Sequence, residues 1–82
     1  MIQTIVKRDG RIVGFNDQKI MAAIRKAMLH TEKGEDERLI QQITDHISVH
    51  GKPQMSVEDI QDAVEMELMK SARKDVAQKS IA

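Results

Sequence analysis

The chain contains no cysteine, no tryptophan, no tyrosine and one phenylalanine, Phe15. The missing cysteines exclude disulfide bridges, cysteine-ligated zinc and thiol catalysis, and they fit a reducing compartment, so we expect a cytoplasmic protein. Proteins that stack nucleic-acid bases on aromatic side chains need more than one aromatic residue. The 13 basic and 13 acidic side chains cancel, so the basic excess of a typical nucleic-acid binder is also missing. Nucleic acid is therefore not an expected partner.

The length and the motif content leave little scope for catalysis. With 82 residues, the chain forms one small domain whose thin core buries about 60–65% of the unfolded surface, too little for a large enclosed active site. It has no Gly-rich phosphate loop, no histidine zinc motif on a helix and no nucleophile elbow. No apolar run approaches the roughly 18 residues of a membrane span. We expect a soluble domain without catalytic residues, a metal site or a membrane span.

Residues 1–15 predict a β-hairpin. Apolar and polar side chains alternate from Ile2 to Lys7 with the period of an extended strand. Asp9-Gly10 then predicts a tight turn, because Gly10 adopts a positive φ without steric cost and Asp9 tolerates one. Residues 11–15 return as the second strand. Because an isolated two-stranded hairpin is marginal in water, this one must pack on other elements.

Two amphipathic helices are predicted to follow the hairpin. Asn16 or Asp17 caps the first, whose apolar face consists of Ile20, Ala23, Ile24, Ala27 and Met28. The polar segment 30–34 predicts a loop. The second helix is expected from about Glu35 to His50, with a buried stripe of Leu39, Ile40, Ile43 and Ile47. Gly51 is expected to end it as a left-handed cap.

The remaining sequence predicts one further strand at most and up to two helices. Gln54 and Met55 leave a short third strand open. Ser56 is expected to cap a third helix, with Asp59 three residues later as in a capping box. A fourth helix from Ser71 would turn inward the side chains of Val76, Ala77 and Ile81. Because it stops at Ala82 without a terminating residue, we expect an N-terminal fragment of a larger protein.

These elements predict an α+β fold: a single domain over residues 1–82, in which the β-hairpin packs on a bundle of three to four helices. The five methionines within the predicted elements are expected to fill its core: Met21, Met28, Met55, Met66 and Met69. His46 and His50 are one helical turn apart, a spacing that can hold a metal. No third ligand is nearby in sequence, so we interpret them as surface residues of the second helix.

Cationic side chains gather around the predicted turn. Lys7 and Arg8 precede it, Arg11 follows it, and Asn16 and Lys19 lie at the start of the first helix. Lysine, arginine and the free N–H groups of a helix start all favour an anion, so the cluster predicts a phosphate site. A solvated hairpin tip with ordinary surface charges explains the same residues. The residues alone leave both interpretations open.

Segment 5–16, IVKRDGRIVGFN, followed by Lys19-Ile20 and Ala23-Ile24, resembles the opening of the ATP-cone domain. The similarity extends over essentially the whole chain, because length and element order also match. Residues 59–65, followed by Leu68-Met69, are most similar to the N-terminal cone of anaerobic, class III ribonucleoside-triphosphate reductases. The cone of an aerobic ribonucleotide reductase large subunit is the second assignment. A plain interaction module for protein or nucleic acid is the remaining alternative.

The resemblance implies a nucleotide site of nine residues. Lys7 and Arg8 would contact the phosphates, and Gln61 would reach the phosphates or the ribose. The side chains implied to pack on the adenine are those of Ile5, Phe15 and Ile20. The positions implied to read the base and the sugar are Val13, Asn16 and Lys19. At Val13 the chain departs from members that have a base-binding Glu.

The resemblance also implies the function. ATP or dATP, with or without magnesium, would bind as an allosteric effector and set the overall activity of the parent reductase. The chain itself would not be an enzyme, because the radical and the thiols of such reductases lie in other domains. Its partners would be adenine nucleotides, the catalytic domain of the parent enzyme and, through that enzyme, a homo-oligomer.

Overall fold

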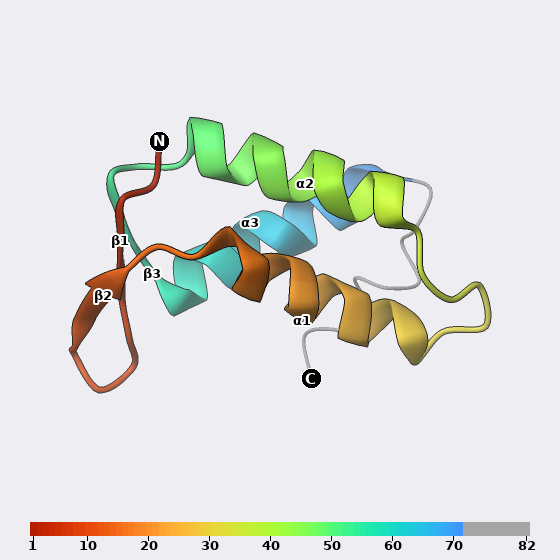
Figure 1. Ribbon diagram of the computed structural model, residues 1–82, viewed down its shortest axis with the longest axis horizontal. Coiled ribbons are helices and arrows are strands. Elements are labelled where there is room, and N and C mark those ends of the chain that lie inside the picture. Colours follow the sequence, from red (N-terminus) through yellow and green to blue (C-terminus); the bar gives the residue numbers. More distant parts are fainter. Residues whose placement is uncertain (72–82) are drawn as a thin grey trace.

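The computed structural model describes residues 1–71 as a small sheet and three helices (Figure 1). The strands are β1 (Thr4–Val6), β2 (Ile12–Gly14) and β3 (Gln54–Ser56). The helices are α1 (Asp17–Leu29), α2 (Glu37–His50) and α3 (Val57–Lys70). The sheet lies at one end of the molecule and the helices extend away from it (Figure 1). The predicted α+β fold, with N-terminal strands packed on helices, is confirmed.

The sheet has the order β2-β1-β3. β1 and β2 pair antiparallel, with Ile5 opposite Val13, and form the predicted hairpin. The short third strand is also present, and it pairs parallel to β1 with Met55 beside Ile5. Both outer strands have only three residues, so little edge is exposed for pairing with another chain. The two hairpin strands are shorter than the sequence predicted.

Helix α1 begins where the sequence placed its cap. Asn16 has extended backbone angles, and its side chain accepts a hydrogen bond from the N–H of Gln18 at 3.0 Å. Ile20, Ile24 and Met28 form its buried face. The polar loop that follows contains Gly34 at φ +70°, a conformation that glycine adopts without steric cost.

Helix α2 begins two residues later than predicted, at Glu37. The reason is that Asp36 acts as its cap, with its carboxylate accepting from the N–H of Leu39 at 3.1 Å. Arg25 of α1 forms two hydrogen bonds of 2.8 Å with the Glu37 carboxylate and joins the two helices. Those hydrogen bonds hold the pKa of Glu37 below its ordinary value and raise the pKa of Arg25.

The predicted left-handed cap at Gly51 is wrong. Gly51 has φ −69° and ψ 160°, which are extended angles available to any residue. Glycine is needed there for a different reason. A Cβ at this position would collide with the Ile2 side chain and would lie 2.8 Å from the Ile47 carbonyl oxygen. The N-terminal segment passes close to the last turn of α2 here, since the Ile2 N–H donates to the Ser48 carbonyl at 2.9 Å.

Helix α3 begins as predicted at Ser56, whose hydroxyl accepts from the Asp59 N–H at 3.1 Å. Ser71 closes the helix, and its hydroxyl donates to the Leu68 carbonyl at 2.6 Å. The predicted fourth helix, with Val76, Ala77 and Ile81, lies outside the described residues.

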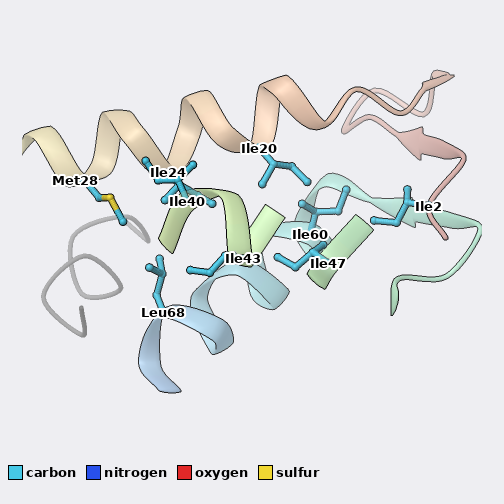
Figure 2. Close-up of a cluster of buried hydrophobic side chains, with 9 residues drawn as sticks. All are labelled: Ile2, Ile20, Ile24, Met28, Ile40, Ile43, Ile47, Ile60 and Leu68. Carbon is cyan, nitrogen blue, oxygen red and sulfur yellow. The ribbon is translucent and has the colours of Figure 1, made fainter. Parts of the chain in front are cut away.

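The core lies between the helices and continues to the sheet (Figure 2). Its nine buried side chains are Ile2, Ile20, Ile24, Met28, Ile40, Ile43, Ile47, Ile60 and Leu68. Figure 2 shows Ile2 at the sheet end and Met28 and Leu68 at the other end. The expectation that every methionine fills the core is wrong for Met66 and Met69, which are 58% and 45% exposed. Both lie on the face of α3 that turns away from Ile60 and Leu68.

Candidate functional site

The hairpin turn is built by local hydrogen bonds. The Gly10 N–H donates to the Lys7 carbonyl at 2.9 Å, and Gly10 has φ +88° as the turn requires. Asp9 accepts the backbone N–H of Arg11 at 3.0 Å and its Nε–H at 2.7 Å. The hydrogen bond from the Arg11 backbone lowers the pKa of Asp9 most. The hydrogen bond from the Arg11 side chain and the nearby charge of Lys7 lower it further. Arg11 is thereby paired within the turn itself, whereas Lys7 and Arg8 form no hydrogen bond or ion pair with Asp9.

Arg8 connects the turn to α3. Its Nη2 donates to Gln61 Oε1 at 3.3 Å, which brings together two predicted site residues that are 53 positions apart in sequence. Its Nε also lies 3.0 Å from Glu58 Oε1. Glu58 was not predicted as a site residue, because its place in the first turn of α3 is sufficiently explained by the helix dipole. The pair with Arg8 is visible only in the tertiary structure.

The apolar part of the candidate site lies on the sheet face that packs against the helices. Ile5 and Val13 are direct partners across β1 and β2, and both are half-buried. Ile5 and Phe15 pack against the core cluster, and the Phe15 N–H donates to the Gln3 carbonyl at 3.0 Å. Ile20, 7% exposed, is itself a core residue, so only a small part of its surface is open to a ligand.

The start of α1 supplies the remaining predicted residues. Asn16 and Lys19 are exposed, and the Lys19 N–H donates to the Asn16 carbonyl at 3.2 Å. The Asn16 side-chain oxygen is engaged by its capping bond, which leaves its amide NH₂ as a donor. Within residues 1–71 the Lys7 and Lys19 side chains form neither an ion pair nor a hydrogen bond. Two unpaired ammonium groups therefore accompany Arg8 at this end of the molecule.

A concave feature lies away from the hairpin. It is an open groove of about 270 Å³ between α2 and α3, lined by Leu39, Gln42, Ile43, His46, Glu67, Lys70 and Ser71. None of the nine predicted site residues lines it. Chemistry decides against it as the nucleotide site, because it offers one lysine and one carboxylate where a triphosphate needs several cations.

The two neighbouring histidines of α2, His46 and His50, form no metal site with other residues of segment 1–71. Their rings lie 4.5 Å apart, and His46 Nε2 lies 3.4 Å from Glu67 Oε1 of α3. In the part of the chain that the structure describes, no group of three or more His, Asp or Glu side chains is arranged to hold a metal ion. None of the helices described is long and apolar enough to cross a membrane.

Comparisons with known proteins match the sequence of this chain to a family. The model of the family described as ATP cone domain matches residues 3–82. The vitamin B12-dependent ribonucleoside-diphosphate reductase of Thermoplasma acidophilum is 43% identical over 74 residues, covering 87% of this chain and 9% of that protein. The ribonucleoside-diphosphate reductase subunit alpha of Chlamydia pneumoniae is 33% identical over 91 aligned positions, covering 98% of this chain and 9% of that protein. The chain thus spans less than a tenth of the length of these relatives.

Proposed function

The chain belongs to the ATP-cone domain family, and on this premise we propose that it binds ATP and dATP as allosteric effectors. The nucleotide would lie at the sheet end of the molecule, between the hairpin, the start of α1 and the start of α3. The observation that carries the proposal is the Arg8–Gln61 hydrogen bond, which joins the cationic turn to the helix whose residue would reach the phosphates or the ribose.

The charges around this position suit a triphosphate. Lys7 and Lys19 form no ion pair or hydrogen bond within residues 1–71, and Arg8, although paired with Glu58, is exposed at the surface. Lysine ammonium groups and an arginine fork bind phosphate oxygens through charge-assisted hydrogen bonds, roughly twice as strong as neutral ones. The half-buried side chains of Ile5 and Phe15 pack against the core, and their remaining exposed surface would receive the adenine.

We propose that occupancy of this site regulates a ribonucleotide reductase of which the chain is one domain. ATP would favour an active state and dATP an inactive one. The two effectors differ by one 2′-hydroxyl, so they regulate only if they bind the two states with different affinities. The catalytic domain would carry out the reaction, and the active and inactive states would be two states of a homo-oligomer of the parent enzyme. A cytoplasmic location belongs to the same proposal.

The most specific part of the proposal concerns the class of the parent enzyme. Residues 59–65 are similar to the cones of anaerobic triphosphate reductases, but both relatives named above are ribonucleoside-diphosphate reductases. The relatives therefore give the anaerobic assignment no support. We propose that the parent enzyme reduces ribonucleoside diphosphates, with the anaerobic triphosphate reductase as the second candidate.

Calorimetric titration of the 82-residue chain with ATP, dATP and GTP tests the binding proposal. We expect both adenine nucleotides to bind. The double variant Lys7→Ala/Arg8→Ala should weaken ATP binding by on the order of 10- to 100-fold, because a hydrogen bond to a charged group contributes about 1.5–3 kcal/mol.

A matched control uses the opposite end of the molecule. Lys33→Ala/Arg38→Ala removes the same two kinds of charge from the loop before α2 and from its first turn. This variant should bind ATP as the wild type does. If neither adenine nucleotide binds to the wild type, the proposed function is wrong. If the two double variants weaken binding equally, the phosphate site lies elsewhere.

A further inference from the structure

One carboxylate already occupies the arginine that the proposed site needs for phosphate. Glu58 Oε1 lies 3.0 Å from Arg8 Nε, while Arg8 Nη2 donates to Gln61. Among the ion pairs within residues 1–71, this is the one that joins the hairpin turn to a helix. The guanidinium is thus bound to an anion before any nucleotide arrives.

A phosphate and the Glu58 carboxylate compete for the same donor group. The guanidinium donates through a planar set of five N–H groups, and both anions bind it through oxygen atoms in that plane. A phosphate that takes the Nε–H must displace the carboxylate. A phosphate that binds beside it places two anions a few ångströms apart, and their repulsion weakens binding. In either case Glu58 lowers the affinity for a phosphate at Arg8.

We propose that Glu58 competes with the phosphates of the nucleotide for Arg8. This competition lowers the affinity most for the nucleotides that carry the most phosphate charge. The inference rests on the proposed function, because it requires the phosphates to bind at Arg8. When the triphosphate takes the guanidinium, the hairpin turn loses its ion pair with α3. Nucleotide occupancy is thereby coupled to the contact between these two elements.

The exposure of the pair limits the size of the effect. The Arg8 and Glu58 side chains are 68% and 55% exposed. Exposed ion pairs are weak because water and salt screen them, so Glu58 modulates the affinity and does not block the site. Removing its charge should therefore tighten ATP binding by about two- to fivefold.

The test is a titration series with ATP, AMP and adenosine on the 82-residue chain, its Glu58→Gln variant and a Glu65→Gln control. Glu65 lies two turns further along the same side of α3 and forms no ion pair within residues 1–71. We expect Glu58→Gln to tighten ATP binding two- to fivefold, AMP binding by less, and adenosine binding not at all. Glu65→Gln should leave all three affinities unchanged.

A double-mutant cycle separates competition for Arg8 from simple repulsion. In an Arg8→Gln background, titrated at millimolar ATP, the Glu58→Gln gain should disappear. An equal gain in that background overturns the proposal, since Glu58 would then act without Arg8. Unchanged or weaker ATP binding by Glu58→Gln also overturns it, and leaves the proposed function standing if the wild type binds ATP. Failure of the wild type to bind ATP overturns both.

Discussion

Replacing Gly51 with alanine tests the close approach of the N-terminal residue Ile2 to the end of α2. The structure predicts that the new Cβ would collide with the Ile2 side chain, approaching its Cδ1 to 2.7 Å, and would lie 2.8 Å from the Ile47 carbonyl oxygen. The carbonyl belongs to the last turn of α2 and has little freedom to move. Ile2 is 3% exposed and is held in the core, so its side chain has little free space to enter.

The expected cost follows from two opposing effects. Overpacking a tight site costs about 1–3 kcal/mol. Alanine at a compatible φ restricts the unfolded chain, which returns about 0.4–1 kcal/mol, and the φ of −69° at Gly51 is compatible. We therefore expect Gly51→Ala to lower the free energy of unfolding by about 1–2 kcal/mol. For a domain of this size, that corresponds to a fall in Tm of about 5–15 °C.

Urea unfolding followed by circular dichroism of the helices measures this cost, since the chain has no tryptophan or tyrosine to report by fluorescence. Gly34 is the matched control. It has φ +70°, and a Cβ there would meet nothing within 4 Å, so substitution at Gly34 perturbs the backbone angle alone. Asparagine tolerates left-handed angles better than alanine does. Asn should therefore cost less than Ala at Gly34 and at least as much as Ala at Gly51.

Two results would refute this reasoning. If Asn is better tolerated than Ala at Gly51, a left-handed backbone explains the glycine and the close approach does not. The second result comes from the Ile2→Ala background, in which the colliding side chain is removed. There the cost of Gly51→Ala should fall, because neighbouring substitutions that share a contact are not additive. Strict additivity would show that the two residues do not meet.

Three further predictions concern the helices. Arg25→Gln should raise the pKa of Glu37, measured by NMR titration of its carboxyl group. An unchanged pKa would contradict the pairing. Because folding lowers the pKa of Glu37 from 4.5, the pair stabilises the fold above about pH 4.5, and this stabilisation is lost as the pH falls through the lowered pKa. Thr44→Val should stabilise the fold by about 1 kcal/mol in urea unfolding, because the buried Thr44 hydroxyl has no hydrogen-bond partner among residues 1–71, and a loss of stability would show that it has one. Leu68→Ala should cost about 2–5 kcal/mol in the same assay, since Leu68 is 0% exposed, and a smaller loss would mean that the last turn of α3 packs loosely.

The local elements could be predicted from sequence because local chemistry encodes them. The Asp9-Gly10 turn and the caps at Asn16 and Ser56 each depend on hydrogen bonds between residues at most three positions apart. Such bonds form with little help from the rest of the chain, so spacing reveals them. Glu35, Asp36 and Glu37 all suit the positive N-terminal end of a helix, so spacing alone leaves the start of α2 uncertain by a residue or two.

The candidate site could be predicted only in part. Lys7 and Arg8 are neighbours in sequence, and their cationic character is plain from it. The likeness of the segment to a known family brought Gln61 into the same prediction, and the structure places it against Arg8. Glu58 had no such signal, because an acid in the first turn of a helix is common for reasons of the helix dipole alone.

The sequence by itself determined the period of each strand and helix, the turn and the caps at Asn16 and Ser56, since these depend on interactions within a few residues. The tertiary structure alone decided the parallel pairing of β1 with β3, the need for glycine at Gly51 and the ion pair between Arg8 and Glu58. Each of these joins segments about 50 residues apart in sequence. Such contacts form only when the helices bury their apolar faces together, and hydrophobic burial is not directional enough to reveal its partners in the sequence.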